Sequence, residues 1–166
     1  MRDFPVVVVV GPRQSGKTTL LRHVVGKERP IISLEPPDVR AAATADPRSF
    51  INLYPPPVVY DEIQYTPGLL PYIKEQVDAR RDEPGQYILT GSQNLLLMQQ
   101  VTESLAGRAA ILKLLPMTQR EIAGEPQRPL PWERTQLPAF ASAPAYGELW
   151  AQILRGSYPE LVKVPQ

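Results

Sequence analysis

Eight consecutive residues early in the chain have the types and spacing needed to bind the phosphates of a nucleotide. Residues 11–18 match the P-loop pattern G-x-x-x-x-G-K-[S/T]. The glycines let the backbone curl so that successive N–H groups face an anion, and a helix that begins near Lys17 directs its positive end toward the same anion. Lys17 is expected to reach the β- and γ-phosphates, and the Thr18 hydroxyl to ligate Mg²⁺. The predicted nucleotide-binding residues are Gly11, Pro12, Arg13, Gln14, Ser15, Gly16, Lys17, Thr18 and Thr19.

A pair of adjacent carboxylates at the end of an apolar segment is the second candidate for chemistry. Val58, Val59 and Tyr60 predict a buried strand, and Asp61 and Glu62 follow directly. Both carboxylates should therefore lie at the sheet edge where the P-loop opens. Asp61 is expected to hold magnesium, mostly through its water shell, and Glu62 to orient and polarise an attacking water. Alone, such a pair is also typical of a helix cap or a solvated loop.

A polar segment ends a later strand in the same way. Thr90, Gly91 and Ser92 follow an apolar run, and a side chain here could sense the γ-phosphate from a position beside the attacking water. The alternative is that Thr90 satisfies a strand end while Gly91 makes a turn. The sequence does not separate Thr90 from Ser92 as the sensor.

Three further polar residues have two interpretations each. Arg108 precedes a predicted strand and could act as an arginine finger, in a neighbouring subunit, or could pair at a helix end with Glu103 or with carbonyl groups. Arg13 could face the phosphates or lie on the outside of the loop. Gln64 could help to position the attacking water or could be an ordinary loop residue.

These candidates need a parallel sheet to bring them together. Apolar and β-branched runs predict five strands, at residues 6–10, 30–34, 58–61, 87–90 and 109–115. Between the strands, 3.6-residue periodicity and Pro or Gly signals predict helices at residues 17–25, 38–45 with Asp38 as the cap, 47–53, from Pro67-Gly68 onward, 94–105 and 147–155. Strands that alternate with helices indicate an α/β fold with helices on both faces of a parallel sheet.

The composition argues against several kinds of partner and site. The chain has 18 basic and 17 acidic residues, so bulk charge gives no support to a nucleic-acid or membrane partner. It has no cysteine, which rules out disulfides and thiolate metal sites and fits a reducing cytoplasm. Residues 4–10 are apolar but lack the basic leader and cleavage site of a signal peptide, and they are interpreted as a strand.

The pattern changes after Gly124. Residues 125–145 are proline-rich and aperiodic, and they predict a linker or an extended arm. The expected organisation is a nucleotide-binding core at residues 1–124, this linker at 125–145, and the start of a truncated C-terminal helical region at 146–166.

Five segments in order resemble one known family. They are Gly-Pro-Arg-Gln-Ser-Gly-Lys-Thr-Thr-Leu at 11–20, Asp-Glu-Ile-Gln at 61–64, Leu-Thr-Gly-Ser-Gln at 89–93, Ser-Leu-Ala-Gly-Arg at 104–108 and Gly-Ser-Tyr-Pro-Glu at 156–160. The set is similar to that of predicted prokaryotic AAA-type P-loop ATPases, which pair this core with a C-terminal domain of unknown function. The resemblance covers most of the chain outside residues 125–144.

The resemblance implies a P-loop NTPase three-layer sandwich of the AAA/ASCE type. Its five-stranded, mainly parallel sheet should have an extra strand between the P-loop strand and the acidic-pair strand. It implies ATP as the nucleotide and carries over Lys17, Thr18, Asp61, Glu62 and the Thr90/Ser92 region, with Arg108 as a candidate. It also implies that the chain is truncated at both ends and that the absent domain bears the partner specificity.

The leading hypothesis is a magnesium-dependent ATPase that cleaves the β–γ bond of ATP by water attack. The second is a nucleotide-gated interaction switch with little turnover and an unknown protein client. A third, a nucleic-acid-stimulated motor, is prompted by the resemblance of Asp61-Glu62-Ile63-Gln64 to a helicase acidic box, but the near-neutral charge argues against it. An oligomer is compatible with each hypothesis.

Overall fold

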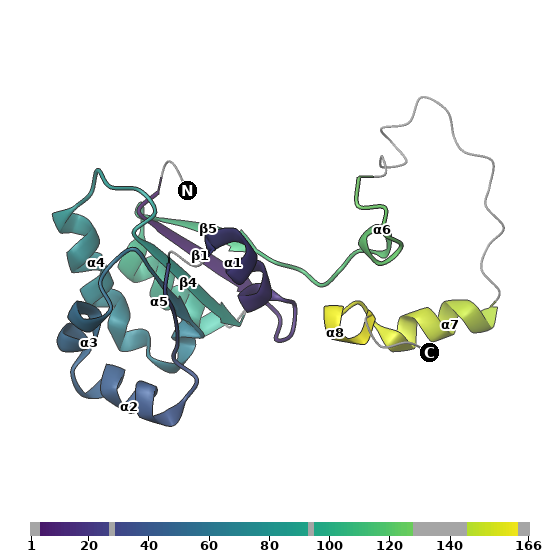
Figure 1. The fold of residues 1–166 in the computed structure, drawn as a ribbon, viewed down its shortest axis with the longest axis horizontal. Coiled ribbons are helices and arrows are strands. Elements are labelled where there is room, and N and C mark those ends of the chain that lie inside the picture. Colours follow the sequence, from purple (N-terminus) through teal and green to yellow (C-terminus); the bar gives the residue numbers. More distant parts are fainter. Residues whose placement is uncertain (1–3, 27–28, 93–94, 128–145, 163–166) are drawn as a thin grey trace. The chain divides into compact units, whose positions relative to one another are not determined.

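The structure is a computed structural model that describes residues 4–26, 29–92, 95–127 and 146–162 (Figure 1). It divides into two compact units, Met1–Leu114 and Leu115–Gln166. The first unit contains the sheet and every candidate residue discussed above.

A five-stranded sheet forms the centre of the first unit. The strands are β1 (Val6–Gly11), β2 (Ile31–Ser33), β3 (Val58–Asp61), β4 (Tyr87–Ser92) and β5 (Ala109–Lys113). Their order in the sheet is β2-β3-β4-β1-β5, and each neighbouring pair is parallel. The five predicted strands are confirmed, with β2 and β5 shorter than expected. β4 lies between the P-loop strand β1 and the acidic-pair strand β3, as the family resemblance implied.

The run of valines in β1 is explained by its central position. Val6, Val8 and Val10 face the larger of two apolar cores, and Val7 and Val9 face the smaller one. Because successive side chains of a strand point to opposite faces, a strand buried on both faces needs an apolar residue at every position. Every residue of β1 is buried. The strand therefore fixes the start of the P-loop firmly within the sheet.

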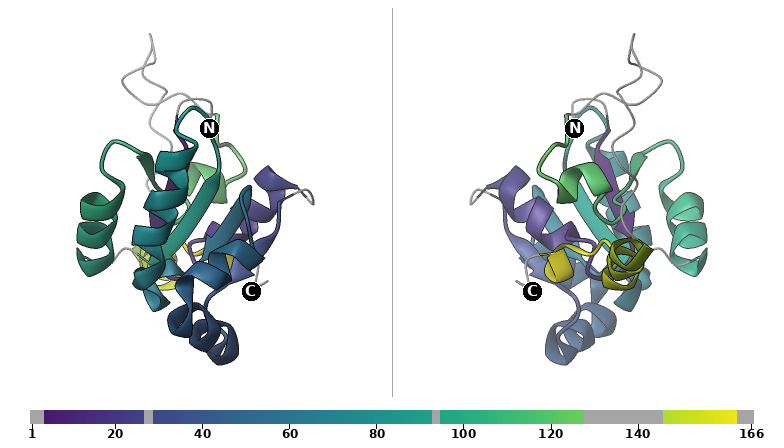
Figure 2. Two further views of the ribbon diagram at one scale, coloured as in Figure 1. Left: turned by 90° about the vertical axis from the view of Figure 1, so that its left-hand side faces the viewer. Right: turned by 90° about the vertical axis from the view of Figure 1, so that its right-hand side faces the viewer.

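Helices cover both faces of this sheet and complete a three-layer α/β sandwich (Figures 1 and 2). Helix α1 (Lys17–Val25) packs on the face of the smaller core through Leu21. The larger core is covered by helices that contribute residues such as Phe50, Ile73 and Leu105. These helices are α2 (Pro37–Ala45), α3 (Pro47–Leu53), α4 (Leu70–Ala79) and α5 (Leu95–Leu105), with short 3₁₀ turns η1 (Ile63–Tyr65) and η2 (Pro67–Leu69) before α4.

One local expectation is wrong. Asp38 does not cap α2: the cap position is Pro36, and Asp38 lies in the first turn, because the proline pair already starts the helix one residue earlier. The apolar residues of α1 differ in their exposure. Leu21 is buried, whereas Leu20 and Val24 are 42% and 63% exposed, because the helix touches the sheet along a narrow stripe.

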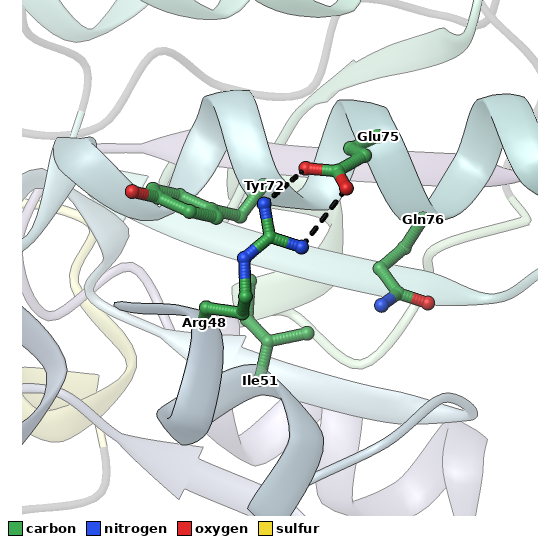
Figure 3. A pocket seen from close by; sticks show the side chains of 5 residues that line it. All are labelled: Arg48, Ile51, Tyr72, Glu75 and Gln76. Atoms are coloured by element: carbon green, nitrogen blue, oxygen red, sulfur yellow. Dashed lines mark hydrogen bonds and ion pairs between the residues drawn. The ribbon is translucent and has the colours of Figure 1, made fainter. Parts of the chain in front are cut away.

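A surface ion pair joins α3 to α4 (Figure 3). Arg48 donates two hydrogen bonds of 2.9 and 2.8 Å to the carboxylate of Glu75, and its guanidinium lies 5.4 Å from the ring centre of Tyr72. Both charged side chains are more than half exposed, so the pair is worth little stability. The hydrogen bond from Arg48 lowers the pKa of Glu75.

The second unit contains short helices. Helix α6 (Gln119–Ile122) begins with a capping box, in which the N–H of Glu121 donates to Thr118 Oγ1 at 3.2 Å and the Glu121 carboxylate accepts from the N–H of Thr118 at 2.6 Å. Helices α7 (Tyr146–Arg155) and α8 (Pro159–Val162) follow, and the predicted helix at 147–155 is thereby confirmed. The apolar side chains of α7 are exposed. Of the expected linker at 125–145, residues 128–145 lie outside the described part of the chain.

Within the described residues, no helix has the length and apolar character that crossing a membrane requires.

Candidate nucleotide-binding site

The P-loop connects the end of β1 to the start of α1, as the pattern predicts. Gly11 approaches the residue after β5 so closely that a Cβ would lie 2.1 Å from the carbonyl oxygen of Leu114, so no larger residue fits without a backbone shift. Further along the loop, Gly16 adopts a left-handed conformation with φ 92° at the helix start. No side chain caps α1, and its first turn holds no acidic residue. The first N–H groups of the helix are therefore suited to an anion.

Lys17 is buried at the base of this loop. Its ammonium group donates to the carbonyl oxygens of Gly11 at 3.1 Å and Pro12 at 2.8 Å. A buried ammonium group needs such partners, because an unpaired charge away from water is costly. Lys17 is thus held inside the curl of the loop, where phosphate oxygens would offer it stronger, charged acceptors.

The P-loop and the acidic strand meet through two side chains. Thr18 Oγ1 donates a 2.9 Å hydrogen bond to Oδ2 of Asp61, which is the last residue of β3. The contact brings a hydroxyl and a carboxylate oxygen side by side at the carboxyl edge of the sheet. Oxygens of these two kinds are the ligands that Mg²⁺ prefers, so the residues present fit a magnesium ion that is also bound by phosphates.

Glu62 has an unusual backbone conformation for its residue type. Its φ of 62° and ψ of 48° are left-handed, which few residues other than glycine adopt without cost. Its N–H donates to Thr90 Oγ1 at 3.1 Å, and the hydroxyl of Thr90 in turn donates to Oδ1 of Asp61. The acidic pair is therefore tied to the neighbouring strand β4 through one buried hydroxyl group.

The two residues that the sequence could not separate have different surroundings. Thr90 is fully buried, and its hydroxyl is already used by Asp61 and Glu62. Ser92 is the last residue of β4 and is partly exposed, and it pairs in register with Gly11, the first residue of the P-loop. Ser92 is therefore the residue of the two that stands at the open edge beside the phosphate-binding loop.

Arg13 belongs to a cluster of charged and aromatic side chains that the sequence does not predict. Its guanidinium donates to the hydroxyl of Tyr65 at 3.1 Å and lies 3.9 Å from the carboxylate of Glu35. The guanidinium of Arg40 lies 4.0 Å from the centre of the Tyr65 ring, a cation–π contact. Arg13 and Tyr65 are 52 positions apart, so no spacing pattern could have indicated this contact.

Arg108 lies at the amino-terminal ends of the strands, whereas the P-loop lies at their carboxyl-terminal ends. It directly precedes β5, whose first residue Ala109 pairs with Val6, whereas the P-loop follows Gly11. Val6 and Gly11 are five residues apart, which corresponds to about 16 Å along the strand. Arg108 donates to both carboxylate oxygens of Asp78, at 2.6 and 3.0 Å, and to the carbonyl oxygen of Ala106 at 2.9 Å. The hydrogen bond from Arg108 lowers the pKa of Asp78.

A cavity of about 280 Å³ also lies at this amino-terminal edge, lined by residues that include Arg29, Glu83 and Gln86. These residues precede β2 and β4, on the side of the sheet away from the P-loop. The cavity is therefore separate from the phosphate-binding edge.

The fold and the site together define a P-loop NTPase. A parallel sheet presents a P-loop, an acidic pair and a polar strand end at one edge, in the strand order 2-3-4-1-5. Residues 3–123, more than half of the chain, match the family model described as an AAA domain. The chain belongs to this AAA domain family and is an AAA-type P-loop ATPase core.

The chain is also similar to two known sequences and to a solved structure. Two uncharacterized proteins, one from Mycobacterium bovis and one from Mycobacterium tuberculosis, are each 36% identical to the chain over 140 residues. The match includes 84% of this chain but 31% of each relative, so the chain spans about a third of their length. The Walker-type ATPase PABY2304 of Pyrococcus abyssi is structurally similar with a TM-score of 0.50, at 19% identity, over 74% of this chain and 52% of that one. This likeness supports the fold alone.

Proposed function

We propose that the chain binds ATP with Mg²⁺ and hydrolyses the β–γ bond of ATP by water attack. The observation that carries the proposal is the contact between Thr18 of the P-loop and Asp61 of the acidic strand, 2.9 Å apart. It brings a phosphate-binding loop and the carboxylates needed for hydrolysis to one edge of the sheet. Membership of the AAA domain family supports the same conclusion.

Binding rests on the P-loop. On ATP binding, Lys17 exchanges the carbonyls of Gly11 and Pro12 for the β- and γ-phosphates. The first N–H groups of α1 bind the same phosphates, and Thr18 and Asp61 would hold the magnesium ion. The ion, when bound, neutralises charge that develops on the phosphate oxygens.

Hydrolysis rests on Glu62 and Ser92. Glu62 orients the water and accepts its proton, since phosphoryl transfer needs positioning more than covalent chemistry. Ser92, beside Gly11 at the open edge, is the better candidate for the γ-phosphate sensor. Thr90 contributes indirectly, because its hydroxyl holds Asp61 and the backbone of Glu62 in place.

Arg108 can contribute only to the site of a second subunit. It precedes β5 at the edge opposite to its own P-loop, about 16 Å away along the strands. For the same reason a role as arginine finger requires an oligomer, in which this edge of one subunit faces the nucleotide of the next. Its pairing with Asp78 would then be exchanged for contact with the γ-phosphate of the neighbour.

The proposal extends to the organisation of the chain. We place the nucleotide-binding core at residues 1–124, a proline-rich linker at 125–145, and a helical region from 146 that leads toward a domain for a protein client. A cytoplasmic location is compatible with a sequence that has no cysteine.

The test is titration of a fluorescent ATP analogue, with and without Mg²⁺, on the wild-type chain and on Lys17→Ala. We expect binding that magnesium strengthens and that Lys17→Ala abolishes. Lys74→Ala, on α4, is the matched control and should bind like the wild type. No binding by the wild type would overturn the proposal, and binding without measurable turnover would favour the nucleotide-gated switch.

A further inference from the structure

Gln64 lies two residues after Glu62 in the short turn η1. The turn is closed by hydrogen bonds from the N–H of Tyr65 to the carbonyl of Glu62, at 3.1 Å, and from the N–H of Thr66 to the carbonyl of Ile63, at 3.0 Å. These bonds fold the chain back directly after the acidic pair. The side chain of Gln64 is thereby brought back toward Glu62.

The residues on either side of Gln64 are anchored. Ile63 is fully buried in the larger core. Tyr65 accepts a hydrogen bond from Arg13, and its ring contacts the guanidinium of Arg40. Because both neighbours are held, the backbone at Gln64 has little freedom to move. A side chain on such a turn can hold another group in a fixed position.

The amide of Gln64 is bound to Glu62 in a definite orientation. Its Nε2 donates a hydrogen bond to Oε2 of Glu62. An ionised carboxylate only accepts hydrogen bonds, so the nitrogen end of the amide must face Glu62. The oxygen end, Oε1, is buried and has no hydrogen-bond partner among the described residues. A buried acceptor without a donor is unusual, so a donor that binds there would satisfy an otherwise unpaired oxygen.

We infer that Gln64 is a positioning residue that orients both Glu62 and the attacking water. Its N–H fixes Oε2 of Glu62, which leaves Oε1 of that carboxylate for the water, and its own Oε1 accepts the second hydrogen of the same water. With both hydrogens engaged, the water presents a lone pair to the γ-phosphorus. This inference rests on the proposed ATP hydrolysis and names a residue that assists it.

The step balances without any further reactant. The water oxygen forms a bond to the γ-phosphorus, and the bond from that phosphorus to the β–γ bridging oxygen breaks, with its electron pair remaining on ADP. Glu62 accepts one proton of the water. Gln64 gains and loses no proton and only holds the two groups in place.

The experiment compares Gln64→Met with Gln99→Met in the 166-residue chain. Methionine keeps the length of the side chain and removes both polar ends. Gln99 is a matched control because its Nε2 also donates to a carboxylate, that of Glu103 at 2.9 Å, but on the exposed surface of α5. We expect Gln64→Met to bind the ATP analogue within about twofold of wild type and to lower the single-turnover rate by about 10- to 100-fold. Gln99→Met should change neither quantity.

A double variant separates positioning from a purely structural role. Because Gln64 and Glu62 hold the same water together, Gln64→Met should slow the Glu62→Gln variant much less than it slows the wild type. Equal slowing in both backgrounds, or a wild-type rate in Gln64→Met, overturns the inference and leaves the proposed function intact. A wild type that binds ATP but does not hydrolyse it overturns both.

A second readout does not depend on turnover. The side-chain NH₂ resonances of Gln64, assigned in a ¹⁵N-labelled sample without nucleotide, should shift in Glu62→Ala, because the carboxylate acceptor is lost. The same resonances of Gln99 should not shift. Unchanged Gln64 resonances would show that the contact with Glu62 does not form, and the inference would fall.

Discussion

The hydroxyl of Thr18 donates a 2.9 Å hydrogen bond to the carboxylate of Asp61, although the two residues are 43 positions apart. The bond joins the first turn of α1 to the end of β3. It shows that the two predicted magnesium ligands are brought together by the fold itself. This contact leads to a prediction about how Mg²⁺ affects nucleotide binding.

Removal of either partner should weaken the response to magnesium. Thr18→Ala and Asp61→Asn each delete an oxygen ligand or its charge, so Mg²⁺ should strengthen binding of an ATP analogue much less than in the wild type. The measurement is the ratio of dissociation constants in excess EDTA and in excess Mg²⁺. A ratio equal to that of the wild type in both variants would contradict the assignment of these ligands.

Glu62→Gln should separate binding from hydrolysis. The amide keeps the size of the side chain but cannot accept a proton, so ATP should bind normally while single-turnover hydrolysis slows by about 10²- to 10⁴-fold. Glu75→Gln is the control, since Glu75 contacts Arg48 on the exposed surface of α4. Normal turnover in Glu62→Gln would show that another group acts as the base.

Thr90 and Ser92 should respond differently to substitution. Thr90→Val removes the hydrogen-bond partner of Asp61 Oδ1 and of the N–H of Glu62. We expect it to lower the free energy of unfolding by about 1–3 kcal/mol, measured in urea. Ser92→Ala should leave stability within about 0.5 kcal/mol of wild type and should slow hydrolysis. If Ser92→Ala hydrolyses ATP at the wild-type rate, the sensor is not Ser92.

The pair of Arg108 and Asp78 predicts an effect of pH. The hydrogen bond from Arg108 holds the pKa of Asp78 below its usual value. Stability from a carboxyl with a lowered pKa is present above the usual pKa and is lost as the pH falls through the lowered one. In Arg108→Ala the pKa of Asp78, measured by NMR titration, should rise, and the small stability difference from wild type should disappear in acid. The same pKa in both chains would contradict the pairing.

Mixing experiments can test whether Arg108 acts on a neighbouring subunit. Lys17→Ala lacks a nucleotide site but keeps Arg108, and Arg108→Ala has the reverse defect. If the arginine acts in trans, each variant alone should be slow and the mixture should recover part of the turnover. The ATPase rate of the mixture is compared with the sum of the separate rates. A mixture that equals this sum, or an Arg108→Ala variant as fast as wild type, excludes the role in trans.

The sequence predicts most of the framework, because strands and the P-loop are specified by short-range patterns. The run from Val6 to Val10 identified a strand buried on both faces, and the structure confirms it. The choice between Thr90 and Ser92 could not be made in this way. Residues two apart on a strand share a face, so the two residues differ only in how far along the strand they lie and in how deeply they are buried.

The features that the sequence does not predict are contacts between residues that are far apart along the chain. Nothing in the sequence pairs Arg108 with Asp78, which is 30 positions away, or Arg13 with Tyr65. Both contacts depend on how α4, α5 and the turn after β3 pack, which short-range patterns do not encode. The exposure of Leu20 and Val24 could not be predicted either, because periodicity identifies an apolar helix face but not how much of that face the sheet covers.

The left-handed backbone of Glu62 means that the residue proposed for hydrolysis is not the residue type that would make this loop most stable. Glycine or asparagine would adopt this conformation more readily, and a chain selected only for a stable fold would favour either one. A glutamate here accepts strain of order 1–3 kcal/mol, which Thr90 and the buried strands around it must outweigh. The most stable version of this loop is therefore one without a carboxylate, and a screen for thermostability alone would tend to select against activity.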